Sequence, residues 1–400
     1  MRFSGINRRG AAALAFCSLL LFIASRPCAA QTETVLYTFC SQPNCVDGAQ
    51  PEASLVMDKD GNLYGTTVGG GANNFGTVFK LSPSGTEMVL YSFCAEAYCT
   101  DGAYPASELI IDKAGNLYGT TPNGGAHGYG MVYKLSPGGT ETVLYSFCAD
   151  RDCPDGEYPS GPVVMDRKGN LYGTTFNGGN QDSSDGTVFK ISPSGIGTVL
   201  YSFCLDRWTC TDGGEPKGGV IRDKKGHLYG ISTGGYGSLF EVSRKRHESV
   251  LYNFADGDYP NGQLIMDEEG NFYGTTFSGG ANGDGKVFQV SPGGTETVLH
   301  TFAGLDGERP EAGVVMDSDG NLYGTTYHGG ANGAGTVFEL SPGGTETVLY
   351  SFCPGATCAD GAYPIAGVII DSKGVLYGTT YGGGQFVENQ GAGVVFKVTP

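Results

Sequence analysis

The feature that most constrains this chain is a tetrapeptide, Tyr-Gly-Thr-Thr or a near copy of it, that recurs seven times. The copies begin at Tyr64, Tyr118, Tyr172, Tyr229, Tyr273, Tyr323 and Tyr377 and are spaced 44 to 57 residues apart. Self-similarity at such a period is typical of architectures in which each repeat packs mainly against its neighbours. The repeat, and not any single motif, therefore decides the fold class.

Each repeat contains four short runs that have the character of β-strands. In the second repeat the runs are 109–112, 116–121, 131–136 and 142–147. The first is continuously apolar, as expected of a strand covered on both faces, and the last alternates in character. Turns rich in Gly, Pro, Asp and Asn separate the runs and favour antiparallel hairpins. One repeat is predicted to be a four-stranded propeller blade with its first strand innermost.

The two ends of the repeat region complement each other. Residues 32–39 match the fourth strand of a repeat, and residues 394–398 match the third. An N-terminal strand at the outer edge of the last blade would close the ring and remove an unpaired sheet edge. The sequence therefore predicts an all-β fold, a seven-bladed β-propeller of four-stranded antiparallel blades in which the N-terminal strand completes the last blade.

Longer signatures accompany the tetrapeptide. They are Gly-Asn-Leu-Tyr-Gly-Thr-Thr at 61–67, Gly-Thr-Val-Phe-Lys-Leu-Ser-Pro at 76–83 and Gly-Gly-Ala-Asn at 329–332. On these motifs, residues 32–400 resemble the GloVer-type tandem repeat of the choice-of-anchor proteins. The resemblance implies an exported, propeller-like protein of unknown activity and transfers no functional residue. Family members often end in an anchoring segment, whereas this chain stops at Pro400 inside its last strand, so we expect a soluble secreted product.

The N-terminus has the parts of a secretory signal peptide. Arg8 and Arg9 precede an apolar run over 11–24 and a tail ending in Cys28-Ala29-Ala30. This run is short for a bilayer span, so a retained anchor is the weaker alternative. We expect a signal peptide over 1–30, a single propeller domain over 31–400, and a secreted or periplasmic location with no membrane span after signal removal.

Charge narrows the classes of partner. The chain has 41 acidic and 24 basic residues and a net charge of −17, which becomes −21 once four arginines leave with residues 1–30. Backbone phosphates require clustered Lys and Arg, so the sequence argues against nucleic acid and anionic lipid. Cations and neutral glycans remain compatible, and acidity also serves simply to keep an exported protein soluble.

Ten of the 12 cysteines follow residue 30 and form five close pairs, each in a loop that links one blade to the next. An even number in an exported context favours local disulfides over metal, because one pair supplies only half of a zinc shell. The copies around Phe254 and Phe302 lack the pair, so the cysteines are expected to stabilise loops. The predicted disulfides are Cys40–Cys45, Cys94–Cys99, Cys148–Cys153, Cys204–Cys210 and Cys353–Cys358.

Just after the cysteine position, every copy has Asp-Gly followed soon by Pro. The aspartates are Asp47, Asp101, Asp155, Asp212, Asp256, Asp306 and Asp360. Strand direction places this loop on the same rim as the loop between the second and third strands, such as 69–76. One interpretation is a ring of acceptors around the channel mouth, suited to calcium or sugar hydroxyls. The other is that Asp and Gly only form the turn into the inner strand.

Residues that break the repeat are candidates for blade-specific chemistry. Trp208, the only tryptophan, lies inside the Cys204–Cys210 loop and either stacks on a sugar ring or plugs the loop. His127 and His328 lie in rim loops, and His300 replaces a repeated tyrosine. Single imidazoles on loops are usually solvated or hydrogen-bonded, and no histidine pair has the spacing of a helical zinc site. The sequence therefore assigns no metal site and no catalytic residue.

Two glycine-rich motifs resemble ligand sites only in part. The Asp-x-x-Gly-Asn segments, such as 58–62, lack the further acidic positions of a helical calcium loop. The Gly-Gly-Ala-Asn loops precede a strand and not the helix N-terminus that a phosphate cradle needs. Both are expected to be turns, and no nucleotide site is predicted.

Three functions remain open. A non-enzymatic binding or surface-interaction module, presenting the disulfide-bearing rim to a glycan, a protein or a cation, fits the uniformity of the repeats and is preferred. A propeller enzyme, such as a lyase, lactonase or glycosidase, would instead need unlike residues meeting at the channel mouth. A structural envelope component is the third. We expect no cofactor, with calcium the one candidate ion, and a monomer whose partner is an extracellular glycan or protein.

Overall fold

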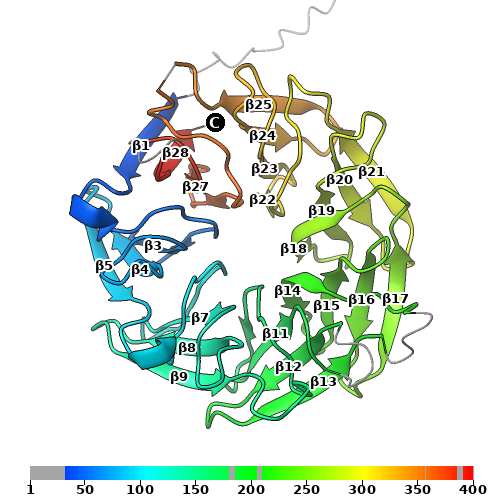
Figure 1. The fold of residues 1–400 in the computed structure, drawn as a ribbon. Coiled ribbons are helices and arrows are strands. Elements are labelled where there is room, and N and C mark those ends of the chain that lie inside the picture. Colours follow the sequence, from blue (N-terminus) through cyan, green and yellow to red (C-terminus); the bar gives the residue numbers. More distant parts are fainter. Residues whose placement is uncertain (1–31, 180–184, 205–209, 356, 385–390, 400) are drawn as a thin grey trace, which may run out of the picture. The chain divides into compact units, whose positions relative to one another are not determined.

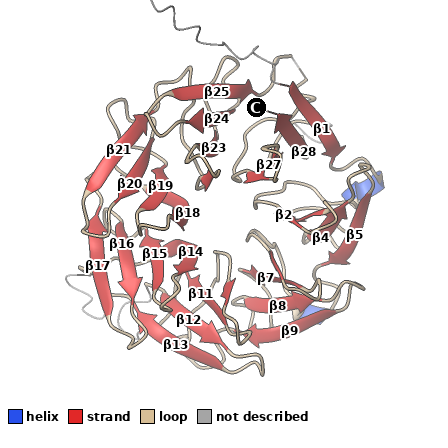
Figure 2. Cartoon of the chain, turned by 180° about the vertical axis from the view of Figure 1, so that it is seen from behind, coloured by secondary structure: helices blue, strands red, loops and turns tan. Residues whose placement is uncertain are grey.

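In a computed structural model, the chain is described over residues 32–179, 185–204, 210–355, 357–384 and 391–399. Within these residues the strands form seven four-stranded antiparallel sheets, arranged as the blades of a closed ring. Figure 1 shows this ring from one side and Figure 2 from the other. The prediction of an all-β seven-bladed propeller is confirmed.

The blades follow one another along the chain, each with its first strand innermost (Figure 1). Blade 1 is β2 (Val56–Met57), β3 (Leu63–Thr67), β4 (Thr77–Leu81) and β5 (Glu87–Ser92); blade 2 is β6 (Ile110–Ile111), β7 (Leu117–Thr121), β8 (Met131–Leu135) and β9 (Glu141–Ser146); blade 3 is β10 (Val164–Met165), β11 (Leu171–Thr175), β12 (Thr187–Ile191) and β13 (Gly197–Ser202). Blade 4 is β14 (Pro216–Arg222), β15 (Leu228–Ser232), β16 (Ser238–Val242) and β17 (Glu248–Asn253); blade 5 is β18 (Pro260–Met266), β19 (Phe272–Thr276), β20 (Lys286–Val290) and β21 (Glu296–Thr301). Blade 6 is β22 (Val315–Met316), β23 (Leu322–Thr326), β24 (Thr336–Leu340) and β25 (Glu346–Ser351); blade 7 is β26 (Ile369–Ile370), β27 (Leu376–Thr380), β28 (Val394–Thr399) and β1 (Thr32–Thr38).

Blade 7 is completed by the N-terminal strand. Its order is β26-β27-β28-β1, and β1 pairs antiparallel with β28 from Thr32 opposite Thr399 to Thr38 opposite Val394. Strands from the two ends of the described chain therefore lie side by side (Figure 1). The predicted closure of the ring by residues 32–39 is confirmed.

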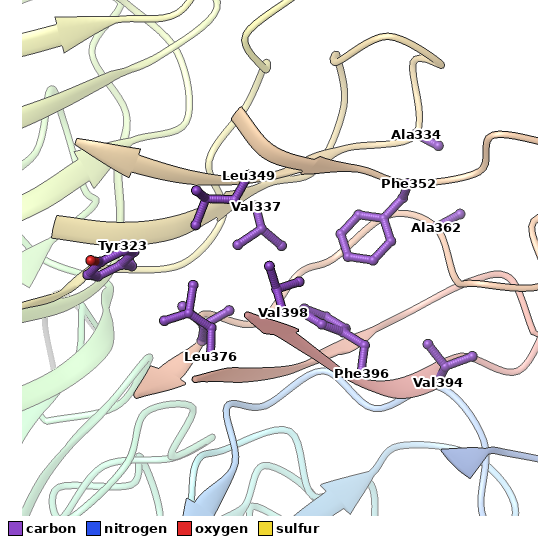
Figure 3. Packing of buried hydrophobic residues seen from close by; sticks show 11 residues of the cluster. Tyr323, Ala334, Val337, Leu349, Phe352, Ala362, Leu376, Val394, Phe396 and Val398 are labelled. Atoms are coloured by element: carbon purple, nitrogen blue, oxygen red, sulfur yellow. The ribbon is translucent and has the colours of Figure 1, made fainter. Parts of the chain in front are cut away.

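The hydrophobic core lies between the blades. The described residues contain seven clusters of buried apolar side chains, one at each junction of consecutive blades. At the junction of blades 6 and 7, Val337 and Phe352 pack with Leu376 and Phe396 (Figure 3). Removing apolar surface from water contributes about 25 cal/mol per Å². Each blade is therefore stabilised mainly by the faces it shares with its two neighbours.

One aromatic contact repeats at every junction. A phenylalanine that follows the outer strand of one blade meets, edge to face, a ring on the third strand of the next blade, with centroids 5.0 to 5.2 Å apart. Such pairs contribute about 0.5–1.5 kcal/mol beyond their area burial. They are Phe39–Phe79, Phe93–Tyr133, Phe147–Phe189, Phe203–Phe240, Phe254–Phe288, Phe302–Phe338 and Phe352–Phe396.

The glycine of the repeated tetrapeptide makes room for these rings. Gly65 lies opposite Phe79 in the β3–β4 ladder. A β-carbon at Gly65 would come within 2.7 Å of the Phe79 ring and 2.9 Å of Leu55. Only a residue without a side chain lets the ring lie flat across the neighbouring strand, which is why glycine recurs in the middle of a strand.

The two threonines of the tetrapeptide have different partners. The first reaches the next blade, as when Thr325 Oγ1 donates to the Ala366 carbonyl oxygen at 2.8 Å. The second stays within its blade, where Thr326 Oγ1 and Thr336 Oγ1 are 2.8 Å apart. The hydroxyls of Thr325, Thr326 and Thr336 are buried, so their hydrogen bonds satisfy groups that would otherwise destabilise the core. The buried Thr174 Oγ1 of blade 3 differs, because it has no hydrogen-bond partner among the described residues.

Helical structure is minor in the described chain. It consists of the three-residue 3-10 turns η1 (Pro43–Cys45) and η2 (Ala97–Cys99), both inside cysteine-bearing loops. Among these residues, none lies in a helix with the length and apolarity required to cross a bilayer.

Deleting residues 31–39 is expected to open the ring. The deletion leaves β28 as an unpaired edge and uncovers the Phe79 ring that Phe39 contacts. We expect the thermal unfolding midpoint, measured by differential scanning calorimetry, to fall by roughly 10 °C or more. A permuted chain that carries residues 31–39 behind residue 400 through a short Gly/Ser linker is the control and should restore the midpoint. A deletion variant that melts like the intact chain would contradict the role of β1.

Candidate functional site

A central cavity of about 850 Å³ lies inside the ring, lined by residues from all seven blades. Its lining includes the residue that follows the repeated proline at the start of each inner segment, which is Glu52, Ala106, Ser160, Lys217, Asn261, Glu311 and Ile365 in blades 1 to 7. These residues differ in size and charge from blade to blade. The cavity is therefore one place where this chain departs from its own repeat.

The carboxyl groups in the cavity have unequal environments. Burial raises the pKa of Glu108 to about 7. Burial also raises the pKa of Glu311, but the charge of Lys217 and a hydrogen bond of 2.7 Å from Asn261 Nδ2 oppose that rise. The pKa of Glu52 is raised by burial alone. Groups that differ in this way are typical of sites that bind polar ligands or transfer protons.

Backbone closes one part of the cavity wall. A β-carbon at Gly218 would come within 2.2 Å of the Gly262 carbonyl oxygen, and one at Gly262 within 2.2 Å of the Gly313 nitrogen. The inner strands of blades 4, 5 and 6 therefore pack backbone against backbone, which glycine permits. Blades 1 and 2 have Ser54 and Glu108 at the position of Gly313, so polar side chains enter the cavity from that side.

The rim beside the cavity is held by an uncommon backbone conformation. Among the described residues, the one before the repeated proline has φ between 51° and 59° in six blades, at Gln50, Tyr104, Tyr158, Glu215, Arg309 and Tyr363. Its backbone joins two loops: the Tyr158 amide donates to the Tyr129 carbonyl at 2.9 Å, and the Phe176 amide donates to the Tyr158 carbonyl at 3.0 Å. A left-handed tyrosine is an outlier that calls for a functional hypothesis.

Aromatic rings gather on this rim. Ring pairs with centroids 5.2 to 5.8 Å apart are Phe75–Tyr104, Tyr129–Tyr158 and Tyr327–Tyr363. In two other blades a cation lies over the ring, Lys217 over Phe176 and Arg309 over Phe277. Tyr158 and Phe176 also line the cavity, so the aromatic rim leads into it. Ala49 bridges Gly69, which places the two predicted loops on one rim.

Six of the predicted rim aspartates lie at blade junctions. Each accepts a hydrogen bond from a residue on the preceding outer strand: Tyr37–Asp47, Tyr91–Asp101, Tyr145–Asp155, Tyr201–Asp212, His300–Asp306 and Tyr350–Asp360. Amides of the same loop donate to these carboxylates, as from Ala95 to Asp101 at 2.8 Å. Within the described residues, none of these aspartates lines the central cavity. Their contacts are those of groups that hold a turn.

Asp256 does not occupy the junction position that the other six aspartates share, so the prediction of seven equivalent carboxylates is wrong at this residue. The loop is shorter in this copy, Asp256 is exposed, and Tyr252 donates to Glu296 at 2.9 Å instead. The buried carboxylate is Asp258, which pairs with Lys286 Nζ at 2.6 Å, while Lys286 also pairs with Glu296 at 2.7 Å. The signal that sequence reasoning missed is Lys286, which stands where blades 1, 3 and 6 have threonine.

A glutamate at the start of the next outer strand completes most junctions. Burial first, and then the charge of the neighbouring aspartate, raises the pKa to about 7 for Glu33, Glu87, Glu141, Glu248 and Glu346. We call the tyrosine or histidine, the aspartate and this glutamate a junction cluster. Where Gly197 replaces the glutamate, a cavity of about 90 Å³ lies beside Tyr145 and Asp155.

The remaining predicted residues are placed as follows. The ten cysteines form the five predicted disulfides within the described chain, so that prediction is confirmed. His328 lies on the rim, with ring centroids 4.4 Å from Tyr327 and 5.4 Å from Tyr363. Trp208 falls outside the described residues.

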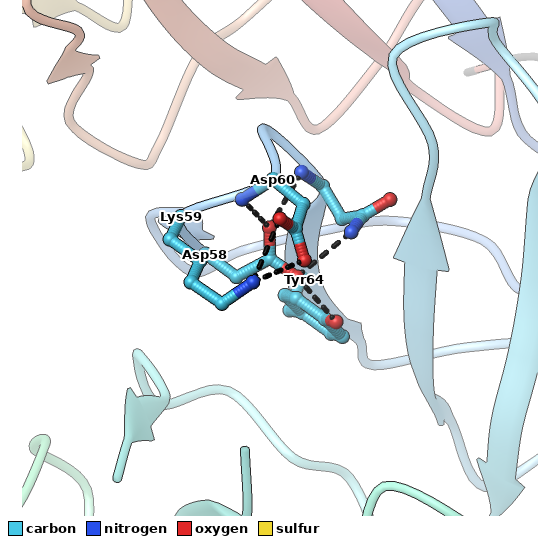
Figure 4. A network of polar contacts seen from close by, with 5 residues as sticks. Asp58, Lys59, Asp60 and Tyr64 are labelled. Carbon is cyan, nitrogen blue, oxygen red and sulfur yellow. Dashed lines mark hydrogen bonds and ion pairs between the residues drawn. The ribbon is translucent and has the colours of Figure 1, made fainter. Parts of the chain in front are cut away.

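The Asp-x-x-Gly-Asn segments form turns, as Figure 4 shows for Asp58. One oxygen of Asp58 accepts from the amides of Asp60 and Asn62, and the other from Asn62 Nδ2 and the Tyr64 hydroxyl, all at 2.8 to 2.9 Å. Both oxygens are thus engaged by the chain itself. The tyrosine of the tetrapeptide serves this turn.

A second groove, of about 590 Å³, lies beside these turns between blades 3 and 4. Its lining includes Lys168, Lys190, Arg222, Arg244 and Arg246, so positive charge gathers here on an otherwise acidic chain. Among the residues that the structure describes, the groove and the central cavity share no lining residue.

Fold and cavity together define the class: a seven-bladed propeller whose acidic central cavity opens at an aromatic, disulfide-bearing rim. Residues 25–238 and 231–400 match the Gloeobacter/Verrucomicrobia repeat, and the chain belongs to that repeat family. No curated protein matches the chain.

Two solved structures illustrate the likeness of fold. The virginiamycin B lyase from Staphylococcus aureus has a TM-score of 0.60 at 10% identity, covering 92% of this chain and 99% of its own. An oligogalacturonate lyase in complex with manganese has a TM-score of 0.56 at 11% identity, covering 92% of this chain and 96% of its own. At such identities the likeness shows the fold alone.

The junction glutamates are expected to make stability fall as pH rises. The pKa of Glu87 and of Glu141 rises from 4.5 to about 7 on folding. Between these values the folded state binds more protons than the unfolded state, so this contribution is full below about pH 4.5 and is lost by about pH 7. The Glu87→Gln, Glu141→Gln double variant should show a flatter fall of the calorimetric midpoint over this range, whereas exposed Glu268→Gln should not. An identical slope in both variants would refute this assignment.

Proposed function

We propose that this chain is an exported binding propeller that takes a neutral glycan at its disulfide-bearing rim, with the terminal sugar units entering the central cavity. The observation that carries the proposal is the placement of the repeat's irregular positions. Residues that differ from blade to blade face the cavity, including Glu52, Lys217, Asn261 and Glu311. Variation of this kind suits recognition of one asymmetric molecule.

The chemistry of the cavity favours a neutral, hydroxyl-rich ligand. A volume of about 850 Å³ lies within the ~300–1,000 Å³ range of small-molecule sites. Carboxyl, amide and ammonium groups supply acceptors and donors for hydroxyls, and Tyr158 and Phe176 offer faces for sugar rings. Three glutamates against one lysine make the lining acidic, which disfavours polyanions.

Two features support the exported part of the proposal. The N-terminal 30 residues have the composition of a signal peptide, which makes the outside of the cytoplasm the expected location. The disulfides Cys40–Cys45 and Cys94–Cys99, with the three others, persist in an oxidising compartment.

Calorimetric titration of residues 31–400 with neutral oligosaccharides, and with uronate oligosaccharides as the charged comparison, tests the proposal. We expect neutral ligands to bind and Glu311→Gln to weaken binding about 10-fold or more, because a hydrogen bond to a charged group is worth about 1.5–3 kcal/mol. Tyr158→Ala should also weaken binding, and the exposed Glu268→Gln is the control. Absence of binding to the whole neutral panel, or unchanged affinity in both cavity variants, would rule out the glycan site.

A propeller enzyme acting on a carbohydrate or lactone is the second candidate, as a lyase or hydrolase at the channel mouth. It is favoured by the contrast between Glu108, whose pKa is about 7, and Glu311, whose charge Lys217 supports. One group suits proton donation and the other acceptance. Glu108→Gln should then lower the turnover of such a substrate about 100-fold or more, and the wild-type rate should change with pH near 7. Release of reducing ends or ring opening, followed from pH 5 to 9, is the assay; equal rates in wild type and variant would exclude this mechanism.

A further inference from the structure

We propose that His300, Asp306 and Glu346 form a divalent-metal site at the junction of blades 5 and 6, with zinc the best-fitting ion. His300 lies on β21, Asp306 in the loop that leads to blade 6, and Glu346 at the start of β25. One ligand atom from each residue lies within 4.8 Å of the others. None of the three lines the central cavity as described, so the site is separate from the proposed glycan site.

The spacing suits a small ion. His300 Nε2 and Asp306 Oδ2 are 3.0 Å apart, and all three ligand atoms lie within 4.8 Å. A tetrahedral zinc with bonds of ~2.0–2.2 Å separates its ligand atoms by ~3.4 Å, which falls inside this span. Small side-chain rotations therefore bring the three atoms to bonding distance.

The comparison with the other junction clusters singles out the imidazole. At five junctions a tyrosine hydroxyl donates a hydrogen bond to the aspartate, as at Tyr350–Asp360, and a protonated phenol is a poor metal ligand. His300 replaces that hydroxyl with Nε2 of the imidazole, which gives its lone pair to a metal when the ring proton is on Nδ1. One neutral imidazole and two carboxylates balance a double positive charge. Calcium, which takes 6–8 oxygen ligands, fits this set poorly.

Neighbouring groups orient the three ligand side chains and leave the site accessible to an ion. The Ala303 amide donates to Asp306 Oδ1 at 2.7 Å, which orients the carboxylate and leaves Oδ2 facing His300. The Phe302 ring packs edge to face on the imidazole at 4.9 Å. One oxygen of Glu346 is buried and accepts no hydrogen bond from the described residues. His300 and Asp306 are 17% and 23% exposed, so an ion and a water ligand can enter.

The site also has a structural use. The loop from Phe302 to Asp306 is one of the two that carry no cysteine pair. An ion held by His300, Asp306 and Glu346 would tie this loop and two outer strands together. The disulfides elsewhere close only their own loops, so the metal would instead join blade 5 to blade 6.

The test is zinc binding to residues 31–400 with disulfides intact, the purification tag removed and no reductant present. Isothermal titration and metal analysis after dialysis should give one zinc per chain, with a rise in the melting midpoint. His300→Tyr should abolish binding and still fold, because it recreates the cluster found at Tyr350, Asp360 and Glu33. His127→Tyr, at an exposed rim position, is the matched control and should bind as wild type.

A gain-of-site variant makes the test independent of any loss of stability. Tyr350→His places an imidazole between Asp360 and Glu33, and the stoichiometry should rise to two zinc ions per chain. With Co²⁺ as probe, each site should add visible absorption, and His300→Tyr should remove the absorption of the wild-type site. No zinc bound by the wild type, or equal stoichiometry in the wild type and His300→Tyr, would overturn the proposal and leave His300 as a hydrogen-bond partner of Asp306.

Discussion

The burial of apolar faces between neighbouring blades is the interaction on which the rest of this structure depends. A single blade is one sheet, and a sheet has no interior of its own, so Phe352 finds cover only when Phe396 of the next blade lies against it. The same contact, repeated at each junction, forces the sheets into a ring. The glycine of the tetrapeptide, as at Gly65, follows from this contact because the ring of Phe79 needs the space. The wall and the size of the central cavity are thus consequences of packing at the junctions.

Polar groups at the same junctions show how much the ring tolerates. Four clusters keep tyrosine, aspartate and glutamate, while single departures at Gly197, Lys286 and His300 leave the surrounding strands unchanged in register. The aromatic and aliphatic contacts between blades determine how the blades pack, so the residues of the junction clusters outside these contacts can vary. Toward the axis the same freedom appears in the side chains that face the cavity. Both proposed sites, the central cavity and the His300 cluster, therefore lie at positions where packing between the blades does not determine the side chain.

The fold was predictable because its signals are periodic. Because the same pattern occurs seven times, each copy supports the strand assignments made in the others. The likeness of residues 32–39 to a fourth strand predicted that they close the ring. The disulfides were predictable because each pair is local in sequence. The cavity was not: Glu52, Lys217 and Glu311 are far apart in the chain, each sits in a segment of small residues without a motif, and only the closed ring brings them together. The position of Asp256 was predicted wrongly because this copy keeps the Asp-Gly pattern but has a shorter loop. In that loop Asp258 takes the buried position.

The pairing of β1 with β28 has a consequence for the time course of folding. Synthesis proceeds from the N-terminus, so β1 exists for the whole period in which the other blades are made and has no partner until Val394 to Thr399 emerge. Contacts of such sequence separation form slowly, because the entropy of closing the loop is lost before any contact compensates it. Thr32, Glu33 and Thr34 are all polar, so the waiting strand begins with a polar segment. The pairing of β1 with β28 is therefore the last step of assembly. Until that step β28 has an unpaired edge, with which a strand of a neighbouring chain can pair.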